Sequence, residues 1–110
     1  NIRRIAEAAR LLNDAGIIVM VSVISPFAAD RKNAADIIGE AFTEVYVSTP
    51  KEECAKRDVK GLYAKAERNE ITNFTGVNSP YEKPRNADIV IDTTGKEVND
   101  CVDELMKLFV

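Results

Sequence analysis

The sequence has no histidine and only two cysteines, Cys54 and Cys101, which lack the spacing of metal ligands. We therefore expect no metal site, and we interpret both cysteines as structural thiols in a reducing, cytoplasmic protein. No apolar run approaches the roughly 20 residues that span a bilayer, so we expect no membrane insertion. The net charge of -3 gives no overall attraction to nucleic acid or anionic lipid. Any bound phosphate must therefore be held by local cations.

A second absence concerns glycine. The chain has five glycines, and none lies in the pattern G-x-x-x-x-G-K-[ST], the loop with which many ATP-using enzymes hold phosphates and Mg²⁺. These residues therefore do not contain that kind of nucleotide site. With 45% hydrophobic and 30% charged residues in 110, the composition indicates one soluble globular domain.

Hydrophobic periodicity predicts the secondary structure along the chain. Apolar residues at helical spacing predict helices, and short β-branched runs predict strands, one of them a continuous apolar run expected to be buried on both faces. Asp30 is the expected cap of the second helix, and Pro50 marks the entrance to the third. The expected helices cover about residues 2–14, 31–41, 51–57 and 98–109, and the expected strands cover 17–24, 45–47 and 89–91.

This alternation of helices and strands predicts an α/β fold with a parallel sheet and flanking helices. The stretch over about residues 57–85 breaks the alternation, because it is polar, contains proline and carries aromatic residues that no core periodicity requires. We interpret this stretch as a loop that closes over a ligand.

Several short motifs carry more specific information. They are Asn1–Ile5, Ile24–Phe27, Lys60–Tyr63, Phe74–Gly76 and Pro80–Glu82. Together they resemble the adenylylsulfate kinase (APS kinase) family, and the resemblance covers residues 1–110. It implies a P-loop kinase-like sheet whose central strand, with the phosphate-binding loop, precedes Asn1. We therefore expect the C-terminal part of one such domain, with an incomplete sheet.

The resemblance implies an activity and its partners. Such an enzyme transfers a phosphoryl group from ATP, with Mg²⁺, to the 3′ hydroxyl of adenosine 5′-phosphosulfate (APS), giving PAPS for sulfate assimilation. Residues 1–110 alone would supply acceptor-binding and lid elements and be inactive. A homodimer or a fusion to a sulfurylase domain is expected. The alternative is a non-catalytic nucleotide-binding or interaction module of the same ancestry. Gluconate and shikimate kinases are more distant alternatives, which lack the combination of the Lys60–Tyr63 and Phe74–Gly76 motifs.

Ser25 follows the apolar run at the position where ligands bind in open α/β sheets. It is either a turn serine before Pro26 or, as the resemblance implies, an APS-contacting residue together with Ile24. The resemblance also makes Ser25 a candidate catalytic residue, as a phosphoserine. Asn1 resembles an acceptor-binding asparagine, although it is also a suitable helix cap. Arg31 is expected to be a surface partner of Asp30.

In the expected lid, the resemblance assigns substrate contacts to Lys60, Leu62, Asn73 and Phe74. Lys60 would bind an anionic oxygen, where the alternative is a solvated lysine. Phe74 would stack on adenine, where the alternative is a loop residue packed on the core.

The resemblance assigns nucleotide and lid roles to Arg57 and Arg68. The chain departs from the family pattern near them, with Ala64 in place of a common lysine and Glu67 in place of an arginine. Asn78 stands where aspartate is usual, and it keeps an acceptor but loses a charge. These departures put nucleotide affinity at the lid in doubt.

Overall fold

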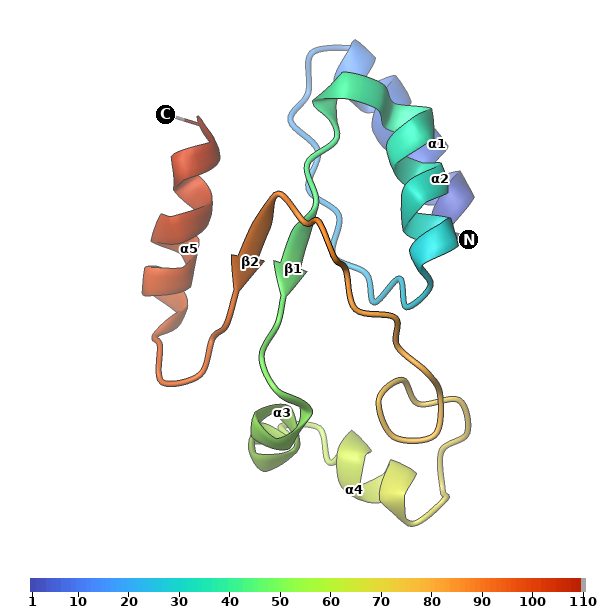
Figure 1. Ribbon diagram of the computed structural model, residues 1–110, viewed down its shortest axis with the longest axis vertical. Coiled ribbons are helices and arrows are strands. Elements are labelled where there is room, and N and C mark those ends of the chain that lie inside the picture. Colours follow the sequence, from blue (N-terminus) through green and yellow to red (C-terminus); the bar gives the residue numbers. More distant parts are fainter. Residues whose placement is uncertain (110) are drawn as a thin grey trace. The chain divides into compact units, whose positions relative to one another are not determined.

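The computed structural model describes residues 1–109, and Figure 1 shows the order of its elements. Two α-helices precede the first strand, two lie between the two strands, and one follows the second strand. The α-helices are α1 (Ile2–Asp14), α2 (Ala28–Ile38), α3 (Lys51–Arg57), α4 (Leu62–Glu67) and α5 (Val98–Met106); the strands are β1 (Val45–Val47) and β2 (Ile89–Ile91); two 3₁₀ turns cover Gly39–Ala41 and Lys107–Phe109.

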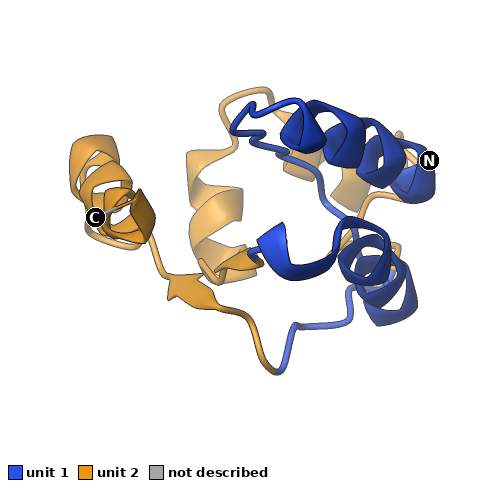
Figure 2. Ribbon diagram, turned by 90° about the horizontal axis from the view of Figure 1, so that it is seen from above, with its two compact units in different colours: residues 1–43, 80–85 blue, residues 44–79, 86–110 orange. Residues whose placement is uncertain are grey.

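The chain divides into two compact units, coloured separately in Figure 2. The first unit contains Asn1–Thr43 and Pro80–Arg85, and the second contains Glu44–Ser79 and Asn86–Val110. The expected lid, residues 57–85, is therefore divided between them.

In the first unit, α1 packs against α2. Ala6 and Ala9 of α1 and Ala34 of α2 are buried. Because alanine side chains are small, the helices can approach closely, and the Arg10 guanidinium donates a hydrogen bond of 3.3 Å to the carbonyl of Ile37. The helix predicted over residues 2–14 is confirmed.

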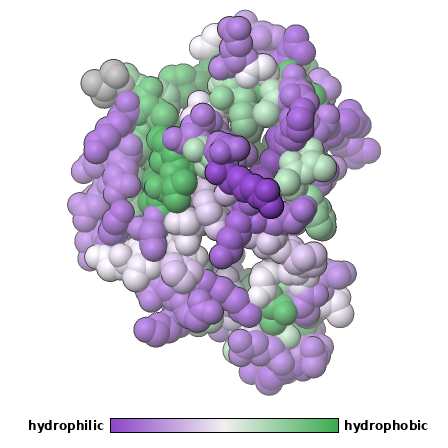
Figure 3. Space-filling view, in the orientation of Figure 1, coloured by the Kyte–Doolittle hydropathy of each residue, from purple (hydrophilic) through white to green (hydrophobic). Residues whose placement is uncertain are grey.

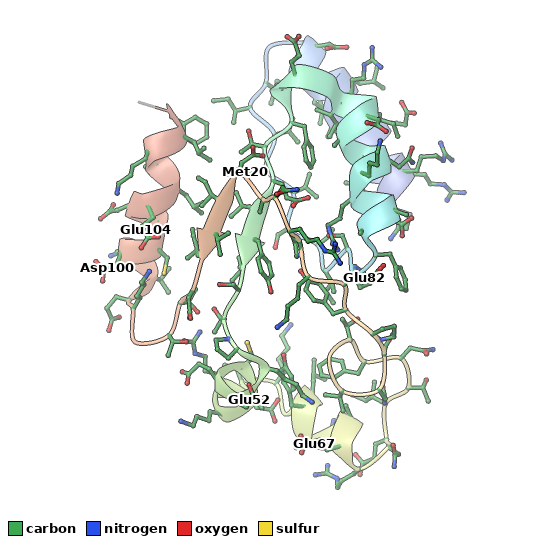
Figure 4. All side chains as sticks on the ribbon, in the orientation of Figure 1. Met20, Glu52, Glu67, Glu82, Asp100 and Glu104 are labelled. Atoms are coloured by element: carbon green, nitrogen blue, oxygen red, sulfur yellow. The ribbon has the colours of Figure 1, made fainter. Side chains whose placement is uncertain are left out.

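The predicted buried strand over residues 17–24 is wrong. This segment has no regular secondary structure among the described residues, and it exposes apolar side chains, with Ile18 at 67% and Met20 at 88% (Figure 4). Its β-branched composition is typical of strands, but a strand also needs a neighbouring backbone to pair with its N–H and C=O groups. Within residues 1–109, neither β1 nor β2 pairs with it.

In the second unit, β1 and β2 form a parallel pair, with Tyr46 opposite Val90. Ile91 is 2% exposed and belongs to the small core of this unit. The Asp88 carboxylate accepts a 2.7 Å hydrogen bond from the amide of Glu44 and so extends the pairing beyond the strands. The strands predicted over residues 45–47 and 89–91 and the α/β class with flanking helices are confirmed. The described sheet has two strands, where three were expected.

The predicted helices differ from the structure in their bounds and in their number. The second and last helices end at Ile38 and Met106, and a 3₁₀ turn follows each, up to residues 41 and 109. The second helix begins at Ala28 rather than at residue 31, so Asp30 lies inside its first turn and does not cap it. An acidic side chain there still interacts favourably with the helix dipole. The six-residue helix α4 was not predicted, because the sequence suggested a loop throughout the lid. The helix expected from Lys51 is confirmed after Pro50.

The last helix, α5, lies beside β2 in Figure 1, and Lys96 before it forms a 2.8 Å ion pair with Glu104 (Figure 4). Hydrophobic side chains gather over β2 beside this helix in Figure 3, and the exposed apolar residues of this unit include Val90, Val98 and Val102. In the described part of the chain, no helix is long and apolar enough to cross a membrane.

Candidate functional site

The turn at Ser25 is fixed by several bonds to a distant segment of the first unit. Ser25 has a φ of 39°, a left-handed conformation that non-glycine residues rarely adopt. The Glu82 amide donates a 2.8 Å hydrogen bond to the carbonyl of Pro26. The Glu82 carboxylate accepts a 3.2 Å hydrogen bond from the amide of Ala28 (Figure 4). The turn and the segment that starts at Pro80 are therefore held together.

Arg31 completes this contact, and its expected role as a surface partner of Asp30 is wrong. Only 9% of Arg31 is exposed, and it is the buried charged residue of the described chain. Its guanidinium lies 5.8 Å from the centre of the Tyr81 ring. Because α2 begins at Ala28, Arg31 lies one helical turn before the buried Ala34 and shares its face. The side chain is therefore directed into the unit.

Asn1 and Ile24 belong to the same unit as Ser25. Asn1 is the N-cap of α1 through its backbone, because its carbonyl accepts a 3.1 Å hydrogen bond from Ile5 while its side chain makes no cap bond. The side-chain amide of Asn1 therefore makes no capping hydrogen bond to the helix. Ile24 is 62% exposed and offers an apolar surface beside Ser25.

The second unit places hydroxyl groups at the carboxyl ends of both strands. The side-chain oxygens of Thr49, after β1, and Thr93, after β2, lie 2.6 Å apart, and the Thr49 oxygen accepts a 3.0 Å bond from the Thr93 amide. Arg57 at the end of α3 donates to the Thr93 hydroxyl at 2.8 Å and to its carbonyl at 3.1 Å. Arg57 also pairs with Glu53 at 3.2 Å. The guanidinium of Arg57 thus contacts both Thr93 and Glu53 in this structure.

Lys60 lies in a turn that Asp58 and Gly61 shape. The Asp58 carboxylate accepts hydrogen bonds of 2.9 Å from the Tyr63 amide and 3.2 Å from the Ala64 amide, and so satisfies the N-terminus of α4. Gly61 has a φ of 65°, which glycine adopts without steric cost. The side chain of Lys60 is exposed, and Leu62, the first residue of α4, is 36% exposed.

Phe74 packs against Tyr63 with their ring centres 5.0 Å apart and their planes at 81°, an edge-to-face arrangement. Asn78 holds the loop around Phe74. Its side-chain oxygen accepts a hydrogen bond from the Phe74 amide, and its side-chain nitrogen donates 2.6 Å to the carbonyl of Ile71. Asn73 has a φ of 55° and an exposed side chain. The loop thus fixes the backbone of Phe74 by bonds that leave Asn73 at the surface.

Arg68 lies just after α4, where Glu70 binds it through two hydrogen bonds of 2.9 and 3.2 Å. This contact lowers the pKa of the Glu70 carboxyl. Nearby, burial, followed by interaction with Cys54 and Asp58, raises the pKa of the Tyr63 phenol. The phenol is therefore neutral and can donate a hydrogen bond at neutral pH.

The structure groups the predicted residues by unit. Asn1, Ile24 and Ser25 belong to the first unit, whereas Arg57, Lys60, Leu62, Arg68, Asn73 and Phe74 belong to the second. Among residues 1–109, no group of three or more Cys, Asp or Glu side chains is placed to hold a metal ion.

Sequence reasoning did not assign site roles to Asp58, Thr49 or Thr93, and it misplaced Arg31. Asp58 follows the last residue of a predicted helix and precedes the glycine turn, which is a recognisable capping position. Thr49 and Thr93 each follow a short predicted strand, where polar side chains are common in α/β sites. The burial of Arg31 had no such local signal.

Comparisons with known proteins agree on one relationship. The family model described as adenylylsulphate kinase matches residues 1–92. An adenylyl-sulfate kinase of Clostridium acetobutylicum is 50% identical over 97% of this chain, and the bifunctional enzyme NodQ of Rhizobium sp. strain N33 is 56% identical over 96%. The chain spans 54% of the length of the first relative and 16% of the second.

A solved structure supports the fold. The APS kinase CysC of Mycobacterium tuberculosis, in complex with AMPPNP and APS, superposes with a TM-score of 0.91 and 40% sequence identity. The match covers 98% of this chain and 64% of that one. The chain belongs to the adenylylsulfate kinase family.

Proposed function

We propose that the full-length protein transfers a phosphoryl group from ATP to the 3′ hydroxyl of APS, forming PAPS, and that the described residues contribute acceptor binding and the lid. The observation that carries the proposal is the similarity to CysC, whose structure holds APS and AMPPNP, over 98% of this chain at 40% identity. The adenylyl-sulfate kinase of Clostridium acetobutylicum, 50% identical, supports the same reaction.

On the acceptor side, we assign substrate contacts to Asn1, Ile24 and Ser25 in the first unit. Ser25 would position the acceptor through its hydroxyl. The turn fixes the backbone of Ser25, and a preorganised group lowers the entropic cost of orienting a ligand, so we assign Ser25 to positioning rather than to a covalent step.

In the lid, we assign Lys60 to an anionic oxygen of APS and Phe74 to its adenine. Lys60 is an exposed cation on a turn fixed by Asp58, which suits a charged ligand arriving from solvent. Phe74 packs edge-to-face on Tyr63, and a base that stacks on one of its faces gains roughly 1 to 3 kcal/mol. Leu62 and Asn73 would complete these contacts.

Arg57 and Arg68 are assigned to the nucleotide and the lid, and each must exchange a present partner to act there. Arg57 would release Glu53, and Arg68 would release Glu70. Exposed ion pairs of this kind contribute only about 0 to 1 kcal/mol, so a phosphate can compete for either arginine.

Apart from these two arginines, the residues present do not form a site that fits the phosphates of ATP and Mg²⁺. The sequence contains no G-x-x-x-x-G-K-[ST] loop. Among the described residues, no three Cys, Asp or Glu side chains are grouped so that they could hold a metal ion. When bound, ATP supplies the phosphoryl group and Mg²⁺ supplies positive charge that neutralises the phosphates. We assign no step that involves ATP or Mg²⁺ to the residues of this chain.

The test uses the full-length protein. We expect release of ADP to depend on APS and to be accompanied by PAPS, both detected by chromatography. Binding of APS without turnover would favour a non-catalytic nucleotide-binding module. A full-length protein that neither binds nor phosphorylates APS would overturn the proposal. A homodimer and a fusion to a sulfurylase domain both remain proposals; similarity to an enzyme named as bifunctional supports a fusion, which the mass of the full-length protein tests.

A further inference from the structure

Arg31 joins two segments of the first unit that lie far apart in the sequence. One terminal nitrogen of its guanidinium donates a 2.7 Å hydrogen bond to the carbonyl of Ser25, and the other donates a 2.6 Å bond to the carbonyl of Glu82, which is 51 residues away. Both terminal nitrogens are thus used by the protein. Arg31 is therefore suited to shape the turn rather than to bind a ligand itself.

The turn needs such an anchor. Ser25, with a φ of 39°, adopts a conformation in which the side chain of an L-residue crowds its own backbone. Such conformations persist only where the surrounding structure fixes them, and they gather at functional sites. The bond from Arg31 ends on the carbonyl of Ser25 itself, so it acts on the strained residue directly.

The geometry favours arginine over lysine at this position. A planar guanidinium can donate to two carbonyls at once, and the central carbon of the Arg31 guanidinium also lies over the Tyr81 ring, 5.8 Å from its centre. A lysine ammonium at the same position keeps the charge but lacks the rigid fork. Replacing Arg31 by lysine therefore separates charge from geometry.

We propose that Arg31 is a positioning residue for the acceptor: it holds Ser25 in its left-handed turn against the Tyr81–Glu82 segment and so sets the affinity for APS. This inference rests on the proposed function. It predicts a selective effect, because Arg31 orders the residues assigned to APS and none assigned to ATP.

The test measures KM for APS and for ATP, together with kcat and Tm, in the full-length protein. For Arg31→Met we expect KM for APS to rise at least about tenfold, which corresponds to about 1.4 kcal/mol. KM for ATP should stay within about twofold. Arg31→Lys should fall between the wild type and Arg31→Met, because one carbonyl can still be bound.

The control is Lys32→Met on the same helix. It removes the same charge from the neighbouring position, where Lys32 forms an exposed pair with Asp36 at 2.8 Å. We expect it to leave both KM values unchanged. Tyr81→Leu removes the ring but retains both carbonyl bonds, and its effect on APS should be smaller than that of Arg31→Met.

Equal increases in both KM values, or a lower kcat with both KM values unchanged, would show a merely structural role for Arg31 and overturn the inference. If Arg31→Met does not fold, Arg31→Lys decides: a selective rise in KM for APS supports the inference, and unchanged KM values refute it. A wild-type protein that neither binds nor phosphorylates APS would instead refute the proposed function, and the role of Arg31 with it.

Discussion

Removal of the Asp58 carboxylate should destabilise the lid at a defined point. This carboxylate accepts hydrogen bonds of 2.9 and 3.2 Å from the amides of Tyr63 and Ala64, at the start of α4. A helix of six residues is too short to be stable by propensity alone, so α4 depends on its cap and its packing. Asp58→Ala leaves both amides without their partner.

The size of the effect follows from the role of the carboxylate. Loss of a capping side chain costs about 0.5 to 2 kcal/mol, and this carboxylate binds two amides while its charge lies at the positive end of the helix. We therefore expect Asp58→Ala to lower the free energy of unfolding by about 1 to 2 kcal/mol. Asp58→Asn keeps an acceptor without the charge and should lose about half as much.

The assay is urea denaturation of the full-length protein, combined with hydrogen exchange. In Asp58→Ala, the amides of Tyr63 and Ala64 should exchange faster than in the wild type, because they lose their acceptor. Asp103→Ala, which removes an exposed carboxylate from α5, is the control and should change stability by less than about 0.5 kcal/mol. Unchanged stability and exchange in Asp58→Ala would show that the carboxylate does not cap α4 in solution.

Three further predictions concern the lid. Phe74→Ala and Lys60→Ala should each weaken APS binding in calorimetry, Phe74→Ala by roughly 1 to 3 kcal/mol; added salt should shrink only the Lys60→Ala deficit, and unchanged affinity with a lower Tm in both variants would identify packing residues. Asn78→Asp should loosen the loop, because a carboxylate cannot donate to the carbonyl of Ile71, at a cost of about 1 kcal/mol measured by urea denaturation; a more stable variant would contradict this. Glu70 has a lowered pKa in the folded state, so its small stabilisation is present at neutral pH and disappears as pH falls through that pKa; Glu70→Gln and wild type should therefore converge in stability in acid, and a gap that widens there would refute the sign.

The sequence predicted well those elements whose signals are local. Tyr46 and Val90 lie in short β-branched runs that pair with each other inside the described chain, so composition and structure agree. Residues 17–24 have a stronger strand composition, yet no described strand pairs with them, because pairing depends on a neighbour that composition does not reveal. A β-branched, apolar composition is therefore not enough to place a strand.

The site shows the same division. The turn chemistry of Gly61 and the isolated aromatic ring of Phe74 marked the lid from sequence, although their roles toward a ligand stay predictions. The burial of Arg31 could not be predicted, because its partner carbonyl on Glu82 lies 51 residues away and a carbonyl has no signature in the sequence. Only the fold brings such groups together.

The bonds among Thr49, Thr93 and Arg57 also have a consequence for motion. The hydroxyl and backbone of Thr93 take part in four hydrogen bonds with these two residues. At about 0.5 to 1.5 kcal/mol each, these bonds together oppose opening of the segment after β2 by about 2 to 6 kcal/mol, so a conformation with this segment open would be populated at a few per cent or less. A ligand that requires the open form loses affinity by that fraction, whereas one that binds the closed form meets a surface already in place.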